Sequence, residues 1–137
     1  MKTFRISRFL LAPFSLWLLA GCNEIEPVEI KEGTVGFYRK NDGGVIGQTK
    51  AVALSKQQIQ FVQSWLNANT KDWSSHNPMA TYLPHWCMSL RTTNEKPIGF
   101  CRIGKRLILR GLEKEIEHPL SEGDSSAFLQ NIEAAGG

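Results

Sequence analysis

Three short segments between His85 and Arg110 alternate apolar and polar residues, and only short turns separate them. The segments cover residues 85–92, 97–103 and 106–110. Alternation of this kind is typical of strands with one buried face, and turns of two to four residues join antiparallel neighbours. The pattern therefore predicts a three-stranded antiparallel meander, which restricts the chain to folds built on a sheet.

The same alternation predicts the register of the strands. With the first turn centred on Asn94, the apolar residues of the first two strands pair on one face, and the third strand continues that face. The residues of this predicted core face are Met88, Leu90, Ile98, Phe100, Leu107 and Leu109. Arg102 falls on the same face near Trp86, where a guanidinium can stack on an indole at the sheet edge. One face of the meander is thus expected to be buried.

Two cysteines fall opposite each other in this register. Cys87 lies on the first strand and Cys101 on the second, and the Cβ atoms of directly opposed residues are about 4.5–5.5 Å apart. A small adjustment then permits a disulfide. Closing a loop of about 15 residues stabilises a fold by about 3 kcal/mol in the chain-entropy model, because it restricts the unfolded chain. We therefore expect a structural disulfide.

Other chemistry for these thiols has less support in the sequence. A redox pair is expected as C-x-x-C, whereas 13 residues separate the two cysteines. A zinc site drawn from the cysteines with His76 and His85 lacks the spacing of known zinc motifs. A cysteine nucleophile paired with His76 or His118 has no family signature around it. The sequence predicts neither a metal site nor a catalytic residue.

A hairpin and two helices complete the expected fold. Residues 34–39 and 45–52 have strand character, and the loop Lys40-Asn41-Asp42-Gly43-Gly44 between them tolerates positive φ. Ser55 and Gln58 form a capping box for an amphipathic helix that ends near residues 67–70. A second, short helix is expected over residues 125–135, capped by Asp124. These elements indicate one small α+β domain over residues 34–137.

The first 22 residues have the organisation of an export signal. Lys2, Arg5 and Arg8 precede an apolar run from Phe9 to Gly21. Its 13 residues are too few to cross a membrane as a helix, which needs about 20. The run ends in Leu19-Ala20-Gly21-Cys22, which resembles the lipobox of bacterial lipoproteins, where a leucine and two small residues precede the lipidated cysteine.

The resemblance implies that residues 1–21 are a signal peptide and that Cys22 carries a diacylglycerol thioether and an amide-linked acyl chain. Several acyl chains together anchor a protein stably. In the enterobacterial sorting pattern an aspartate after the cysteine retains a lipoprotein in the inner membrane, so Asn23 implies the periplasmic face of the outer membrane. The alternative is an ordinary secretory signal whose cleavage site contains a cysteine. Residues 22–33, which are rich in glutamate, are expected to be a lipidated tether with a reach of about 35 Å.

The positive charge of the chain belongs to this leader. The 137 residues include 16 basic and 13 acidic residues, but residues 1–21 hold three of the basic ones and none of the acidic ones. The mature chain of 116 residues therefore has no formal net charge. Together with export, this argues against nucleic acid as a partner.

The remaining charge is divided along the chain. Residues 91–110 sum to +5 and residues 112–137 to −5. Arg91, Arg106 and Arg110 share the predicted sheet face opposite the core, where they either bind an anionic partner or are neutralised by the acidic tail. The neutralised arrangement is the more ordinary of the two.

A second candidate for binding is the long loop over residues 71–84, which shows no periodicity. Exposed aromatic side chains stack on sugar rings or anchor protein interfaces, and this loop holds Trp73, His76 and Tyr82. The alternative is that Trp73 and Tyr82 fold back onto the core.

Taken together, these features favour a non-enzymatic binding module held at the outer membrane. Its expected partner is an envelope protein or glycan, and an inhibitor or immunity-type protein fits the same description. A structural or assembly accessory of an envelope complex is the alternative. An envelope hydrolase comes last, because none of the motifs G-x-S-x-G, H-E-x-x-H or a phosphate-binding loop occurs in the chain.

Overall fold

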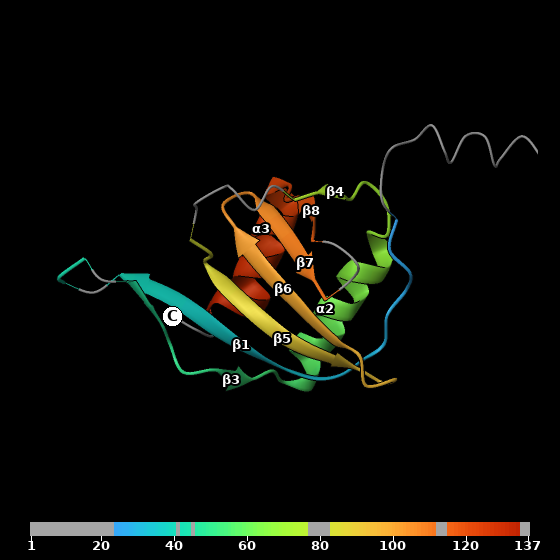
Figure 1. Ribbon diagram of the computed structural model, residues 1–137, viewed down its shortest axis with the longest axis horizontal. Coiled ribbons are helices and arrows are strands. Elements are labelled where there is room, and N and C mark those ends of the chain that lie inside the picture. Colours follow the sequence, from blue (N-terminus) through green and yellow to red (C-terminus); the bar gives the residue numbers. More distant parts are fainter. Residues whose placement is uncertain (1–23, 41, 45, 77–82, 112–114, 135–137) are drawn as a thin grey trace, which may run out of the picture.

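The computed structural model describes residues 24–40, 42–44, 46–76, 83–111 and 115–134. Eight antiparallel strands form one sheet in the order β2-β1-β5-β6-β7-β8-β4, with β3 also paired to β1 (Figure 1). The strands are β1 (Ile30–Lys40), β2 (Ile46–Gln48), β3 (Val52–Ala53), β4 (Ser74–Ser75), β5 (Trp86–Thr92), β6 (Pro97–Ile103), β7 (Arg106–Arg110) and β8 (Ile116–Pro119). The helices are α2 (Lys56–Ala68), α3 (Glu122–Phe128) and the π-helical continuation η1 (Leu129–Glu133). The predicted α+β class is confirmed.

The central meander has the predicted register. Met88 pairs with Phe100, Leu90 with Ile98, and Cys87 with Cys101. The sulfur atoms of the two cysteines are 2.11 Å apart, which is bonding distance. Strands β6 and β7 have the predicted bounds, and β5 begins one residue later than expected. Apolar alternation and turn length were therefore sufficient to align this part of the sheet.

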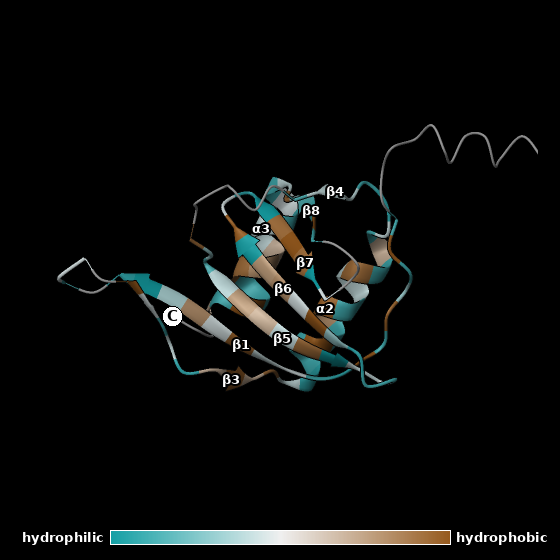
Figure 2. Ribbon diagram, viewed as in Figure 1, coloured by the Kyte–Doolittle hydropathy of each residue, from teal (hydrophilic) through white to brown (hydrophobic). Residues whose placement is uncertain are grey.

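An aromatic cluster fills the space between the sheet and the helices. Helices α2 and α3 lie on one face of the sheet, and Figure 2 shows apolar residues on the central strands and on these helices. The Phe128 ring of α3 stacks on Trp86 at a centroid distance of 5.7 Å, and it meets Phe61 of α2 edge to face at 4.9 Å. Trp65 of α2 lies 6.1 Å from Phe100 of β6. The core is thus continuous from one helix, through the sheet face, to the other.

Arg102 meets Trp86 through a shared carboxylate. The Trp86 indole donates from Nε1 to Glu133 Oε2 at 3.0 Å, and Arg102 forms an ion pair with the same oxygen. Both members of this pair are largely buried, where an ion pair holds its partners in a fixed arrangement. Glu133 therefore fastens η1 to the sheet face beside the aromatic cluster.

The helix ends agree only in part with the sequence expectations. Ser55 and Gln58 form the predicted capping box of α2, and the helix ends at Ala68. The second helix begins earlier than predicted, at Glu122, because Ser121 is its cap. The Ser121 hydroxyl accepts a hydrogen bond from the backbone N–H of Asp124. The prediction that Asp124 is the cap was therefore wrong by one turn.

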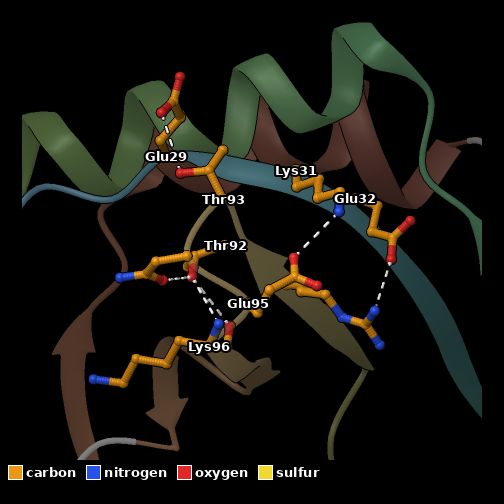
Figure 3. A network of polar contacts seen from close by, with 9 residues as sticks. Glu29, Lys31, Glu32, Thr92, Thr93, Glu95 and Lys96 are labelled. Carbon is orange, nitrogen blue, oxygen red and sulfur yellow. Dashed lines mark hydrogen bonds and ion pairs between the residues drawn. The ribbon is translucent and has the colours of Figure 1, made fainter.

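Residues 24–33, which the sequence assigned to the tether at 22–33, pack against the domain instead. Ile25 and Ile30 are buried in the core. Figure 3 shows the polar network that holds the beginning of β1 to the β5–β6 turn: Thr93 Oγ1 donates to Glu29, and Lys31 pairs with Glu95. The glutamates face solvent while the isoleucines between them face inward, so the segment is amphipathic. Its acidic composition had led to the prediction of a tether.

Two strands occupy segments that the sequence did not assign to the sheet. Strand β8 lies in the stretch read as an acidic tail, and β4 lies in the long loop. Ser74 pairs with Glu117 and Ser75 with Ile116, so the two strands extend the sheet beyond β7. One strand was predicted over residues 45–52, but the structure has two short strands there, β2 (Ile46–Gln48) and β3 (Val52–Ala53), which pair with different parts of β1. The N-terminal hairpin and the meander are therefore parts of a single sheet.

The cysteine pair makes a first prediction. The unreduced protein should be lighter than the reduced protein by two hydrogen atoms, and reduction should lower the free energy of unfolding by about 3 kcal/mol. Urea denaturation with and without a reductant measures this loss. The double variant Cys87→Ala, Cys101→Ala is the matched control, because its stability should not respond to the reductant. Free thiols at both positions in protein purified without a reductant would contradict the prediction.

Candidate functional site

Trp73 is part of the core and not of an exposed binding loop. Its side chain is fully buried, and its Nε1 donates to the Asn69 carbonyl at 2.7 Å. The ring meets Trp65 edge to face at 6.2 Å and lies 5.1 Å from His118. The interpretation of Trp73 as a binding residue is therefore wrong, because a side chain with no exposed surface cannot meet a partner.

His118 is also fixed within the core. Its ring lies 5.2 Å from that of Trp65. Its Nδ1 is 2.7 Å from the carbonyl oxygen of Pro119, a contact that requires Nδ1 to carry a proton. Packing between the indoles of Trp65 and Trp73 accounts for the burial of His118.

His76 belongs to a small polar cluster between β4, β7 and β8. Its Nδ1 lies 3.0 Å from Oε1 of Glu117, and Arg106 forms an ion pair with Glu117 Oε2. The side chains of His76 and Glu117 are 8% and 14% exposed, whereas that of Arg106 is 57% exposed. A carboxylate on Nδ1 orients the histidine of many hydrolases. Here the second carboxylate oxygen is occupied by Arg106, so Glu117 ties the three strands together.

The predicted arginine face exists, and each of its arginines has a carboxylate partner. Arg91, Arg106 and Arg110 lie on the sheet face opposite the helices, as their pairing with Pro97, Ile103 and Gly99 requires. Besides the Arg106 pair, Arg91 lies 3.4 Å from Glu32 and Arg110 lies 3.3 Å from Glu115. The carboxylates come from β1, from β8 and from Glu115, the residue that precedes β8. Internal neutralisation therefore accounts for the charge division better than an anionic partner does.

Two predicted site residues, Cys22 and Tyr82, lie outside the described residues. Within the part of the chain that the structure describes, no group of three or more histidine, cysteine or acidic residues is placed to hold a metal ion. None of the helices described is both long enough and apolar enough to span a membrane.

The β1–β2 hairpin extends beyond the other strands that neighbour β1 in the sheet. Strand β1 pairs with β5 only as far as Phe37, whereas its pairing with β2 continues to Lys40. The end of β1 and all of β2 therefore project past the meander, as Figure 1 shows. We call this feature the hairpin tip and define it by the exposed residues Arg39, Lys40, Asp42, Gly43, Gly44, Ile46, Gly47 and Gln48.

The chemistry of the hairpin tip suits a protein contact. Ile46 is 40% exposed, one of four large apolar residues with substantial exposure among those described. Gln48 is paired with Tyr38, and its side chain lies over Gly36, where a Cβ atom would meet it. Because the strands of this projection are already paired with each other, it needs less ordering than an unpaired loop to enter a concave surface with its exposed aliphatic side chain.

The sequence predicted this hairpin without identifying it as a surface feature. The loop residues predict the turn. The projection depends instead on the place of β1 next to β5 in the sheet and on β1 being the longer of the two strands. Neither relation follows from local composition.

Comparisons with protein-family models, with curated proteins and with solved structures found no match.

The polar cluster makes a second prediction. Glu117→Ala leaves the largely buried His76 without its carboxylate, and should lower the free energy of unfolding by about 1–3 kcal/mol. Arg106→Ala removes an exposed partner of the same carboxylate and should cost less than about 1 kcal/mol. Urea denaturation of the chain beginning at Asn23 measures both. Equal losses in the two variants would contradict the structural role of the His76–Glu117 pair.

Proposed function

We propose that this protein is a lipoprotein of the outer membrane whose domain binds another envelope protein without catalysing a reaction. The lipid anchor is Cys22, and the binding surface is the hairpin tip. The observation that carries the proposal is the projection of the β1–β2 hairpin beyond the meander with all of its described tip residues exposed. An inhibitor or immunity-type protein, which inserts a rigid element into a partner's cleft, fits this shape.

The position of the aromatic residues favours a protein over a glycan as the partner. Glycan sites use exposed aromatic rings as stacking surfaces. Trp73, the first aromatic residue proposed for that role, is fully buried. The hairpin tip offers Ile46 and open space over two glycines, Gly44 and Gly47, and such surfaces suit close approach to another polypeptide.

The surroundings of His76 and His118, the two histidines weighed as catalytic residues, also support a binding role. His76 is held by Glu117, and His118 is enclosed by Trp65 and Trp73. Both residues have partners that explain their burial. A hydrolase is therefore the weaker proposal, and a test for it is turnover that depends on His76.

Photo-crosslinking in intact cells tests the hairpin tip as the binding surface. A photoreactive amino acid at position 46 should give one discrete adduct with an envelope protein. The same group at position 129 is the matched control, because Leu129 is an exposed aliphatic residue on η1 with 54% exposure. The binding proposal is wrong if position 46 gives no adduct, or if positions 46 and 129 give the same adducts.

A charge at the tip should weaken binding to the crosslinked partner. Ile46→Asp should raise the Kd at least about tenfold, the equivalent of about 1.4 kcal/mol, because it places a charge where an apolar side chain is desolvated. Leu129→Asp should leave the Kd unchanged. Calorimetry measures both affinities, and thermal unfolding checks that neither variant is destabilised. An unchanged Kd for Ile46→Asp would move the site away from the hairpin tip.

The anchor is tested separately from the binding surface. Cys22→Ala removes the thiol that accepts the diacylglycerol, so incorporation of labelled palmitate should be lost. The intact protein should in turn partition into detergent and fractionate with the outer membrane. Palmitate incorporation that survives Cys22→Ala would refute the lipobox interpretation.

A further inference from the structure

The segment that follows the proposed lipidation site is fixed to the domain almost from its beginning. Ile25 donates from its backbone N–H to the Thr70 carbonyl at 2.8 Å, and its side chain is 8% exposed. Val28 and Asn67 exchange two hydrogen bonds, at 2.8 and 3.0 Å. Ile30 donates to Gln63 Oε1 at 2.7 Å. The segment therefore runs along the C-terminal half of α2 in the opposite direction, as Figure 1 also shows.

These contacts leave little chain between the anchor and the domain. Only Asn23 and Glu24 separate Cys22 from Ile25, and three peptide steps span at most about 11 Å. A domain of about 100 residues has a radius of gyration of about 13 Å. A connection shorter than the radius of the domain cannot let the domain turn over on its anchor.

The two ends of the domain differ in their distance from the proposed anchor. The beginning of the described chain lies beside the end of α2, and the hairpin tip lies on the opposite side of the domain (Figure 1). We call the first of these the anchor-side surface and define it by the exposed residues Glu24, Glu26, Asn67, Lys71 and Asp72. It includes none of the exposed large apolar residues of the described chain, and its three carboxylates, Glu24, Glu26 and Asp72, outnumber its one cation, Lys71. It therefore suits zwitterionic headgroups and neither the hydrocarbon core nor anionic headgroups.

We propose that the domain rests directly on the bilayer that holds its lipid, with the anchor-side surface against the headgroups and the hairpin tip at the membrane-distal end. The inference depends on the proposed lipidation of Cys22. It adds to the proposed function the direction of approach, because a partner of the hairpin tip then meets the domain from the periplasmic side and at a fixed height above the membrane.

Energy transfer from the domain to the membrane tests this orientation. The lipidated, mature protein is reconstituted into vesicles of zwitterionic phosphatidylethanolamine and phosphatidylcholine that carry a headgroup-bound acceptor. A donor dye is attached through an unnatural amino acid at position 71 or at position 42, both of which are exposed. Transfer should be high from position 71 and low from position 42.

A variant with a longer connection provides the matched control. A flexible Gly/Ser linker of about 20 residues inserted between Asn23 and Glu24 has a root-mean-square span of about 25 Å. Transfer from position 71 should fall, and the difference between the two positions should be lost. Equal transfer from positions 71 and 42 in the native-length protein would overturn the orientation.

The outcome also separates this inference from the proposed anchor. Protein that fails to associate with vesicles and carries no acyl chain by mass spectrometry refutes the lipidation, and with it the orientation. Protein that is lipidated and bound to vesicles but transfers energy equally from both positions refutes the orientation alone.

Discussion

The alignment of β5 with β6 is the constraint on which the rest of the structure depends. A slip of one residue between these strands would exchange the two faces of the sheet and expose Met88 and Phe100 to solvent. In the observed register those side chains meet the helices, and Cys87 lies opposite Cys101. The same alignment brings Trp86 and Arg102 side by side, where Glu133 binds both. Apolar burial, a covalent link and a buried ion pair thus specify one register.

The register also explains why the arginine face does not act as a free basic patch. Alternation that directs Phe100 inward directs Arg106 and Arg110 outward on the next strand. Strand β8 then pairs with β7 and brings Glu117 and Glu115 to those arginines. The division of charge along the chain is therefore a consequence of two adjacent strands with complementary side chains. Such exposed pairs contribute modestly to stability, but they leave little excess charge for a partner.

The sequence was sufficient to predict the structure where local patterns determine it. It was insufficient where contacts between distant segments determine the structure. The bounds of β6 and β7, the register of Met88 with Phe100 and the capping box of α2 all follow from residues close in the chain. Strand β4 has only two residues and depends on β8, about 40 residues away. A local sequence pattern cannot predict a pairing between strands so far apart in the chain. The same reason applies to Trp73, whose burial depends on Trp65 and His118.

Because residues 24–30 pack against the domain, only a short connection separates the domain from the proposed anchor. A long tether would let the domain search for a partner at many distances and angles, and the hairpin tip would then need no particular place in the fold. With the chain fixed to α2 from Ile25 onward, the beginning of the described chain and the hairpin tip lie on opposite sides of the domain (Figure 1). An orienting anchor is useful only to a domain with a directional surface, and a projecting hairpin is such a surface. The burial of Ile25 and Ile30 therefore links the proposed lipid anchor to the direction in which the domain would present the proposed binding surface.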